Sequence, residues 1–437
     1  MGKNQVRRPT SDSNRRRMRD KPSTQKDQTA DSSFQDFRYY DRRLIAVFVV
    51  LFVVPPSISL LIYRFKFSPQ SGPILLPYVR QRGLVKADVN CEEILTEHSN
   101  VSENTSRRHF MNPVLAYITP WNSGGYDMAK RFTSKFTHIS PVWYDLKSHG
   151  TKLVLEGRHN ADIGWISELR MRGDVQVLPR LVLEALPQHV LREKKQRDKA
   201  VDLILKECKD MGYDGIVLES WSRWAAHGVL HDATMRKVAL RFVKQLGEAL
   251  HAVKSDRNSN MHLQLVYVIG PPHTEKLQEH DFGPHDLQTL SESVDGFSLM
   301  TYDFSSAYNP GPNAPLKWIR STLHLLLSAA GRNMAHTIFV GINFYGYDFL
   351  LAEGGGAQAI TGRDYLSLLE QHNPPMRWDK RNAEHYFSYT DSQRRQHAVF
   401  YPTLMSISER LEEARSWGAG ISIWEIGQGL DYFFDLL

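Results

Sequence analysis

The sequence lacks most of the features that mark specialised classes of protein. Two cysteines among 437 residues cannot form a disulfide-rich scaffold. Hydrophobic residues make up 41% of the chain and aromatic residues 11%, which is too much for an intrinsically disordered protein. No Gly-x-Gly-x-x-Gly pattern follows the first apolar run, which argues against a dinucleotide-binding domain. The length allows one large domain with additions, or two ordinary domains.

A net positive charge is also missing from most of the chain. The formal charge is +6, but residues 1–43 alone hold 12 Lys and Arg against six Asp and no Glu. The remaining 394 residues carry 42 basic and 42 acidic groups. We therefore expect no nucleic-acid partner for the main domain. The tail over 1–43 is rich in Arg, Ser, Thr and Gln without apolar periodicity, and is expected to be disordered.

The stretch 44–63 contains twenty residues without a charge. Twenty helical residues span about 30 Å, the thickness of the hydrocarbon core of a membrane. A signal peptide would begin near the N-terminus, and a buried core helix is the other alternative. Pro55 and Pro56 interrupt helical hydrogen bonding midway. We expect a single transmembrane signal anchor here, followed by a luminal stalk over 64–112.

Two glycosylation sequons follow this stretch, at Asn100 and Asn104. They could be used only in the secretory lumen or outside the cell. With the basic tail, they favour a type II membrane protein whose main domain lies in the secretory-pathway or lysosomal lumen or outside the cell. Cleavage of the anchor would secrete it.

From residue 113 onward, short apolar runs alternate with amphipathic helical stretches. Eight such runs lie at 113–119, 136–144, 175–183, 214–220, 262–270, 295–302, 337–346 and 420–426. Strands that alternate with helices predict βαβ units and a parallel sheet. Eight units in about 320 residues fit an α/β fold of the (β/α)₈, or TIM-barrel, type over 113–437. The interval 347–402 is longer than one helix needs, and we expect a small strand-rich insertion there.

Functional side chains of such a barrel come from the C-terminal ends of its strands. At these places the sequence reads DGIVLESW (214–221), MTYD (300–303), GINFYG (341–346) and SIWE (422–425). This set, in this order, resembles glycoside hydrolase family 18, the chitinase and chitinase-like family, over about residues 114–437.

The resemblance implies a changed catalytic strand. In the family, the fourth strand reads Asp-Gly-x-Asp-x-Asp-x-Glu; the Glu is the general acid, and the substrate's N-acetyl group acts as nucleophile. In this chain Asp214 and Gly215 match, whereas Val217 and Glu219 replace the second and third Asp. Trp221 stands where the family has its acid, and an indole cannot protonate a leaving oxygen.

The resemblance also implies a sugar-binding cleft, because aromatic faces suit pyranose rings and polar groups suit their hydroxyls. Trp424 would form its floor, and Tyr345 would close one wall. Glu219 is equally well interpreted as a buried carboxylate that binds Tyr302. The predicted glycan-binding residues are Trp121, Trp143, Glu219, Trp221, Met300, Tyr302, Asp303, Tyr345 and Trp424.

We therefore expect a chitinase-like lectin that binds N-acetylglucosamine-type oligosaccharides without cleaving them. One alternative is a glycosidase whose acid has moved to Glu219 or Asp303, with Tyr302 assisting. Another is a barrel that serves as a scaffold for protein interactions.

We expect no cofactor and no metal ion. His227 and His231 have the spacing of a helical metal pair, but no third ligand is apparent. The spacing of Cys91 and Cys208 does not imply a disulfide.

Overall fold

The computed structural model describes residues 44–59, 76–272, 274, 276–352 and 355–437. The predicted disordered tail over 1–43 and the first part of the predicted stalk, 64–75, lie outside these residues. The chain divides into two units, Met1–Leu75 and Leu76–Leu437.

In the first unit, residues 44–59 are helical, with a π-helical turn η1 (Val49–Val53) in the middle. No helix within the described ranges is long and apolar enough to cross a membrane. The prediction of a transmembrane helix over 44–63 is therefore wrong. At 1.5 Å per residue the described helical segment reaches only about 24 Å, short of the roughly 30 Å of a hydrocarbon core.

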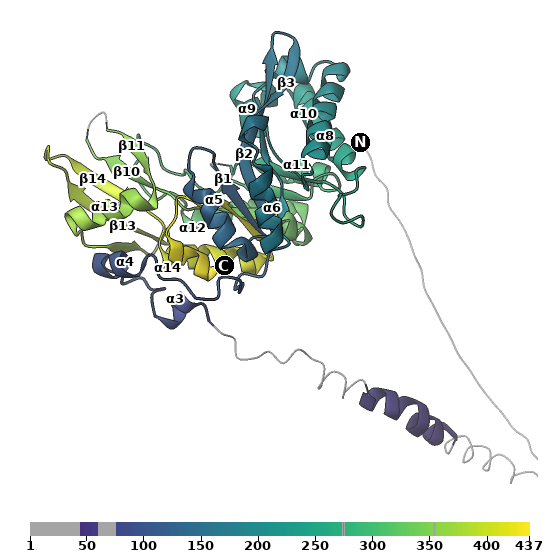
Figure 1. Cartoon of the computed structure of the whole chain (residues 1–437), viewed down its shortest axis with the longest axis horizontal. Helices are drawn as coiled ribbons and strands as arrows, with labels where there is room; N and C mark the ends of the chain where they lie inside the picture. The colour runs from purple at the N-terminus through teal and green to yellow at the C-terminus, as the bar shows by residue number, and fades with distance from the viewer. Residues whose placement is uncertain (1–43, 60–75, 273, 275, 353–354) are drawn as a thin grey trace, which may run out of the picture. The chain divides into compact units, whose positions relative to one another are not determined.

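The second unit is built around a closed barrel of parallel strands, which confirms the predicted (β/α)₈ fold (Figure 1). Each strand pairs with the next in parallel, and the last returns to the first. The barrel strands are β1 (Val114–Ile118), β2 (His138–His149), β5 (Arg180–Leu183), β6 (Gly215–Glu219), β7 (Gln264–Ile269), β8 (Gly296–Leu299), β9 (Ile338–Asn343) and β15 (Gly420–Trp424).

Helices cover the outside of the barrel. They are α5 (Gly124–Arg131), α6 (Ile163–Arg172), α7 (Pro187–Val190), α8 (Lys194–Met211), α9 (Trp221–Ala226), α10 (Ala233–His251), α11 (Pro284–Leu290), α12 (Leu316–Ala330) and α14 (Leu404–Trp417). The longest, α10, begins where the Asp232 side chain accepts the backbone N–H of Thr234 at 2.7 Å. It packs closely at Gly247, where an added Cβ would lie 1.8 Å from the Ser293 carbonyl oxygen. Short 3₁₀ helices are η2 (Thr133–Lys135), η3 (Arg158–Asn160), η4 (Val229–His231), η5 (Arg332–Thr337) and η6 (Asp431–Leu436).

The barrel interior is a packed core. Its buried apolar cluster consists of Leu115, Tyr117, Leu178, Val217, Val266, Val268 and Phe339. A larger cluster fills the space between the strands and the outer helices. Inside the barrel the Tyr117 hydroxyl donates to Ser298 at 2.8 Å, and Ser298 donates to Ser422 at 3.2 Å. The centre of the barrel is thus filled, and function is left to the strand ends.

The predicted insertion between the seventh and eighth barrel strands is present. It forms a five-stranded antiparallel sheet in the order β11-β10-β14-β13-β12, drawn in green and yellow in Figure 1. Its elements are β10 (Gly346–Leu350), β11 (Ala357–Ile360), α13 (Gly362–His372), β12 (Arg377–Asp379), β13 (Glu384–Thr390) and β14 (Gln396–Phe400). The buried Glu384 ties it to the loop after β8, because its carboxylate accepts the backbone N–H groups of Asn313 and Ala314 and pairs with Arg410.

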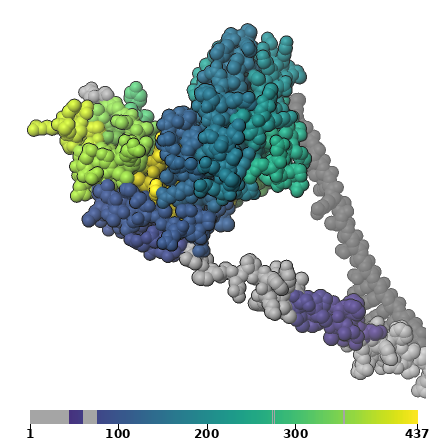
Figure 2. Space-filling view, viewed as in Figure 1, coloured from purple at the N-terminus to yellow at the C-terminus, as the bar shows by residue number. Residues whose placement is uncertain are grey.

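Residues 76–112 pack against the barrel unit (Figure 2). They include α3 (Tyr78–Gln81) and α4 (Cys91–Glu97). The Val79 N–H donates to the Asp435 carboxylate at 2.8 Å, and the Cys91 thiol donates to the Pro374 carbonyl at 2.9 Å. Cys91 and Cys208 are both buried free thiols. Two further strands, β3 (Lys152–Glu156) and β4 (Gln176–Val177), extend the sheet beside β2.

Candidate functional site at the barrel mouth

Asp214, just before β6, and Gly215, its first residue, match the family pattern and support the strand at its N-terminal end. The Asp214 carboxylate accepts the Val177 N–H at 2.9 Å and pairs with Arg170 at 3.1 Å. Gly215 has φ +148°, and a Cβ there would lie 2.1 Å from the Gln264 carbonyl oxygen. This half of the pattern therefore positions the strand and does not reach the mouth.

At the other end of β6, Glu219 is buried, with 8% of its surface exposed. Its carboxylate forms an ion pair with Arg180 of β5. The Ser222 hydroxyl donates to Glu219 Oε1 at 3.1 Å. Glu219 thus faces a guanidinium, and the predicted hydrogen bond to Tyr302 is not formed.

Arg180 contacts several of the side chains at the mouth, although the sequence analysis did not select it. Its guanidinium lies 4.6 Å from the ring centroid of Trp424 and 5.6 Å from that of Tyr117. Burial lowers the pKa of this guanidinium from its usual value. The sequence does contain a signal for this residue, because Arg180 is the single charged residue within the apolar run 175–183. A charge in a buried strand needs a partner. Arg180 and Tyr117 join the predicted residues Glu219 and Trp424 in one contact network.

Trp221, at the position of the family's acid, does not line the mouth. It is the first residue of α9 and is 3% exposed. Its indole N–H donates to the His280 carbonyl at 2.9 Å, and its ring packs edge-on against Phe282 at 5.0 Å. The side chain belongs to the core between the strands and the outer helices.

Tyr302 and Met300 follow the end of β8. The Tyr302 ring lies 6.2 Å from that of Tyr345, and burial raises the pKa of its phenol well above the usual range. Gly341 makes room for this ring, because a Cβ there would lie 2.9 Å from Tyr302 Cε1 and 2.4 Å from the Leu299 carbonyl oxygen. Met300 is partly buried against the inner cluster of the barrel.

Asp303 is the exposed acid of the mouth. Its backbone adopts φ +62°, a conformation uncommon for residues other than glycine, and its N–H donates to the Asn313 side chain at 2.7 Å. Its Oδ1 accepts hydrogen bonds from the hydroxyls of both Tyr345 and Tyr347. Burial and the charge of Asp303 raise the pKa of Tyr345.

The two candidate flanking tryptophans differ in exposure. Trp121, after β1, is 71% exposed and free to meet a ligand. Trp143 of β2 is 3% exposed. Its indole N–H donates to the Tyr126 hydroxyl at 2.8 Å, and its ring packs near Trp165 in the outer core. The predicted sequon residues Asn100 and Asn104 are exposed.

Glu425 is a second buried acid near the mouth that the sequence analysis missed. It follows Trp424 and has no exposed surface. Its carboxylate accepts the Asn122 amide at 2.5 Å and the Gly427 N–H at 3.0 Å. Burial raises its pKa to about 7. Through Asn122 it fixes the loop that carries Trp121.

One group of potential metal ligands occurs among the residues that the structure describes. His251, His262 and Asp295 have donor atoms within 4.8 Å of one another. His251 is the last residue of α10, and His262 and Asp295 lie just before β7 and β8, at the opposite end of the barrel from the mouth. His231, which with His227 has the spacing of a helical metal pair, lies 3.4 Å from the Glu279 carboxylate.

Comparison with known proteins agrees with this geometry. The family model described as "Glycosyl hydrolases family 18" matches residues 187–429. A cortical fragment-lytic enzyme of Bacillus subtilis is 28% identical over 169 residues, which are 38% of this chain and 39% of that enzyme. The chain thus spans less than half the length of that relative.

Solved structures share the fold. A chitinase from Chromobacterium violaceum superposes with a TM-score of 0.62 at 20% identity, covering 74% of this chain and 98% of that one. A family 18 chitinase from Cycas revoluta, solved with (GlcNAc)3, gives a TM-score of 0.60 at 16% identity, with 74% and 97% covered. At these identities the likeness establishes the fold alone.

Proposed function

Because the chain belongs to glycosyl hydrolase family 18, we propose that it is a chitinase-like lectin. It binds oligosaccharides of the N-acetylglucosamine type at the barrel mouth and does not hydrolyse them. The Cycas revoluta chitinase of the same fold was solved with (GlcNAc)3, which supports this choice of ligand. Five longer motifs resemble the subfamily of chitinase domain-containing protein 1 and favour it: AYITPWNSGGYD (116–127), KFTHISPVWYDL (135–146), DGFSLMTYDFSSAYNPGPNAPL (295–316), GINFYGYDF (341–349) and SIWEIGQGLDYFFDLL (422–437).

The observation that carries the proposal is the ion pair between Glu219 and Arg180. A general acid must hold a proton and release it to the leaving oxygen. Beside a guanidinium that stays charged, a carboxylate is stabilised without its proton. The carboxylate of β6 that is nearest to the mouth is thus unsuited to acid catalysis.

The other candidate acid, Asp303, accepts two tyrosine hydroxyls at one oxygen. That oxygen is an acceptor and offers no proton in this arrangement. Trp221, at the acid position of the family, is in the core. Trp221 therefore cannot donate a proton at the mouth, and the Oδ1 atom of Asp303 is occupied by two tyrosine hydroxyls.

Binding groups are nevertheless present. The half-buried Trp424 and the ring of Tyr302 supply apolar faces, while Asp303 supplies an exposed acceptor for sugar hydroxyls. Aromatic surfaces combined with a few oriented polar groups are typical of small-ligand sites.

Calorimetric titration with chitotetraose tests the proposal in the full chain. We expect Trp424→Ala to weaken binding at least tenfold, about 1.4 kcal/mol. Trp417→Ala is the matched control, because Trp417 is a partly buried tryptophan at the end of α14, next to the start of β15 and away from the mouth. Equal affinities of wild type and Trp424→Ala would refute a site at the mouth.

We also propose that the barrel is located in the secretory lumen or outside the cell. The two sequons with exposed Asn100 and Asn104 support this location. Treatment with a glycosidase that removes N-linked glycans should increase the mobility of the cell-derived chain in electrophoresis. A double Asn→Gln variant that migrates like the untreated wild type would contradict the proposal.

A further inference from the structure

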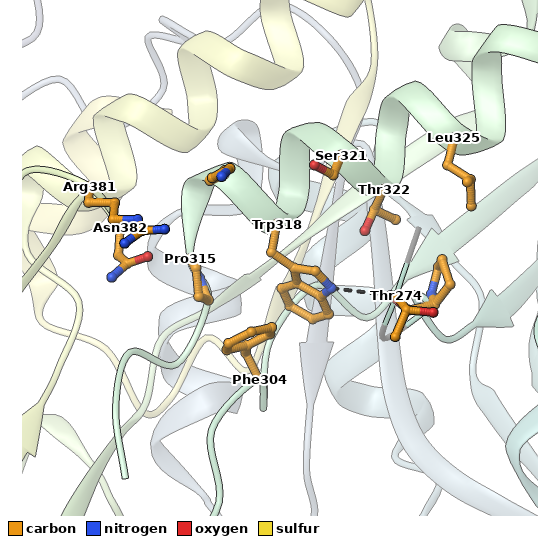
Figure 3. Close-up of a pocket in the computed structure, with 11 residues that line it drawn as sticks. Thr274, Phe304, Pro315, Trp318, Ser321, Thr322, Leu325, Arg381 and Asn382 are labelled. Carbon is orange, nitrogen blue, oxygen red and sulfur yellow. Dashed lines mark hydrogen bonds between the residues drawn. The ribbon is translucent and has the colours of Figure 1, made fainter. Parts of the chain in front are cut away.

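A cavity of about 420 Å³ opens beside the mouth, where the loops after β7 and β8 meet the first turns of α12 (Figure 3). It is lined by residues of those loops, of α12 and of the insertion. None of the predicted glycan-binding residues lines it. Its size is within the range of about 300–1,000 Å³ that is usual for small-ligand sites.

One wall of the cavity is an aromatic corner. The centroids of the Phe304 and Trp318 rings lie 5.0 Å apart, and the rings are tilted by 53°. Figure 3 shows the two rings next to each other. The Trp318 indole N–H donates to the Pro272 carbonyl at 3.2 Å, which fixes the orientation of the ring. Phe304 is 39% exposed. A fixed aromatic surface of this kind suits the apolar face of a sugar ring.

The cavity also holds a hydroxyl that the fold does not use. Thr322 of α12 lines the cavity and is only 2% exposed. A buried helical threonine commonly donates to a carbonyl one turn earlier. Among the hydrogen bonds of the described residues, none involves the Thr322 hydroxyl. The hydroxyl oxygen is not among the fully buried polar atoms that lack a partner, so it faces the open space of the cavity and can bind a polar group of a ligand.

The charged residues of the cavity lining that the structure describes have one sign. Lys317 and Arg381 line it, and no Asp or Glu does so among the described residues. Neither cation forms an ion pair with another part of the chain that the structure describes. Two cations in the lining without an acidic neighbour among the described residues favour an anionic ligand, and an arginine can bind a carboxylate through two hydrogen bonds.

The cavity is rigidly connected to the mouth. Phe304 directly follows Asp303, and both backbone N–H groups donate to Asn313, at 2.9 and 2.7 Å. The Asn313 N–H in turn donates to the buried Glu384 at 2.9 Å. A glycan that lies over Asp303 can therefore continue to Phe304 without any rearrangement of the loop.

We propose that this cavity is a second saccharide subsite, which binds a carboxylate-bearing sugar unit. The inference rests on the proposed function in so far as the rest of the glycan lies at the mouth. Phe304 and Trp318 contact the sugar ring, Thr322 binds a hydroxyl, and Lys317 and Arg381 bind the carboxylate. The chain would then prefer acidic glycans to neutral ones.

The test compares two probes on the full chain by calorimetry. One is neutral chitotetraose, and the other is a tetrasaccharide of alternating N-acetylglucosamine and glucuronic acid. We expect the acidic probe to bind at least tenfold more tightly, with a preference that weakens as salt is added. The double variant Lys317→Gln/Arg381→Gln should remove this preference and leave chitotetraose binding unchanged. Lys195→Gln/Arg394→Gln, at exposed sites that do not line the cavity, is the matched control.

Equal affinities for the two probes in wild type would overturn the inference, as would an acidic preference that survives Lys317→Gln/Arg381→Gln. Tighter binding of a tetra-aspartate peptide than of the acidic glycan would also overturn it. Trp424→Ala separates this inference from the proposed function. If Trp424→Ala leaves binding of both probes intact while Lys317→Gln/Arg381→Gln abolishes the acidic preference, the cavity is a saccharide site and the proposed mouth site is refuted.

Discussion

The ion pair between Glu219 and Arg180 predicts a strong coupling between two substitutions. Each of the two side chains is only about a tenth exposed, so water screens the pair little. Removing one partner of a buried pair leaves the other charge uncompensated and costs about 3–5 kcal/mol. We expect Glu219→Gln and Arg180→Met each to lower the free energy of unfolding by this amount.

The double variant should be far less damaging than the sum of the two. Replacing both partners removes the uncompensated charge, and methionine can still pack against Trp424 and Tyr117. We expect the double variant to lose only about 0–2 kcal/mol, so that the coupling energy is several kcal/mol. Urea denaturation of wild type, the two single variants and the double variant, monitored by tryptophan fluorescence, measures this coupling energy.

A neighbouring ion pair supplies the control. Arg223 and Glu184 are 2.7 Å apart at the same end of the barrel, but their side chains are 47% and 34% exposed. Glu184→Gln should therefore change the stability by no more than about 1 kcal/mol. If Glu219→Gln cost equally little, or if the two single effects simply added, Glu219 would not be in a buried ion pair. The argument against acid catalysis by Glu219 would then fail.

Two further predictions concern other buried side chains. Burial raises the Glu425 pKa from 4.5 to about 7, so the folded state binds the proton more tightly than the unfolded state. The stability that this proton supplies is fully present below pH 4.5 and is lost as the pH rises to 7. In urea denaturation, we expect the free energy of unfolding of wild type to fall by about 3 kcal/mol relative to that of Glu425→Gln across this window. A difference between the two proteins that does not change with pH would refute this. Trp221→Ala should cost about 3–5 kcal/mol of stability without weakening chitotetraose binding, whereas a tenfold weaker affinity in calorimetry would contradict its place in the core.

The barrel could be predicted from the sequence because each of its strands and helices corresponds to a local pattern of residues. Each barrel strand is an apolar run bounded by helical patterns, and the length of the interval 347–402 was enough to predict the insertion. The predicted transmembrane helix was wrong for a related reason. The count of uncharged residues over 44–63 says how apolar the chain is, but it does not say how far the helix extends.

The site was harder to predict because it depends on where each strand ends. Period-two alternation along β6 places residue 221 on the inner face, but the strand stops at Glu219. Ser220 then adopts φ −147° and ψ −26°, and α9 begins at Trp221, so the indole is turned into the outer core. A register shift between Val142 and Tyr144 in β2 similarly accompanies the outward packing of Trp143.

Arg180 could not be assigned from the sequence for a different reason. Its partners Tyr117, Glu219 and Trp424 come from three other strands, and only closure of the barrel brings them together. The single charge in an apolar strand indicates that a partner is needed, but it does not identify that partner.

The central claim is that the mouth binds N-acetylglucosamine oligosaccharides without cleaving them, and one NMR experiment tests both halves. Chitotetraose is incubated with a stoichiometric amount of the full chain, and proton spectra are followed over time with saturation of protein resonances. We predict saturation transfer to the N-acetyl methyl groups, reduced in Trp424→Ala, and no new reducing-end anomeric signals. The account would be contradicted by new anomeric signals that appear at the rate of an active chitinase and are lost in Glu219→Gln. An absence of saturation transfer would also contradict it.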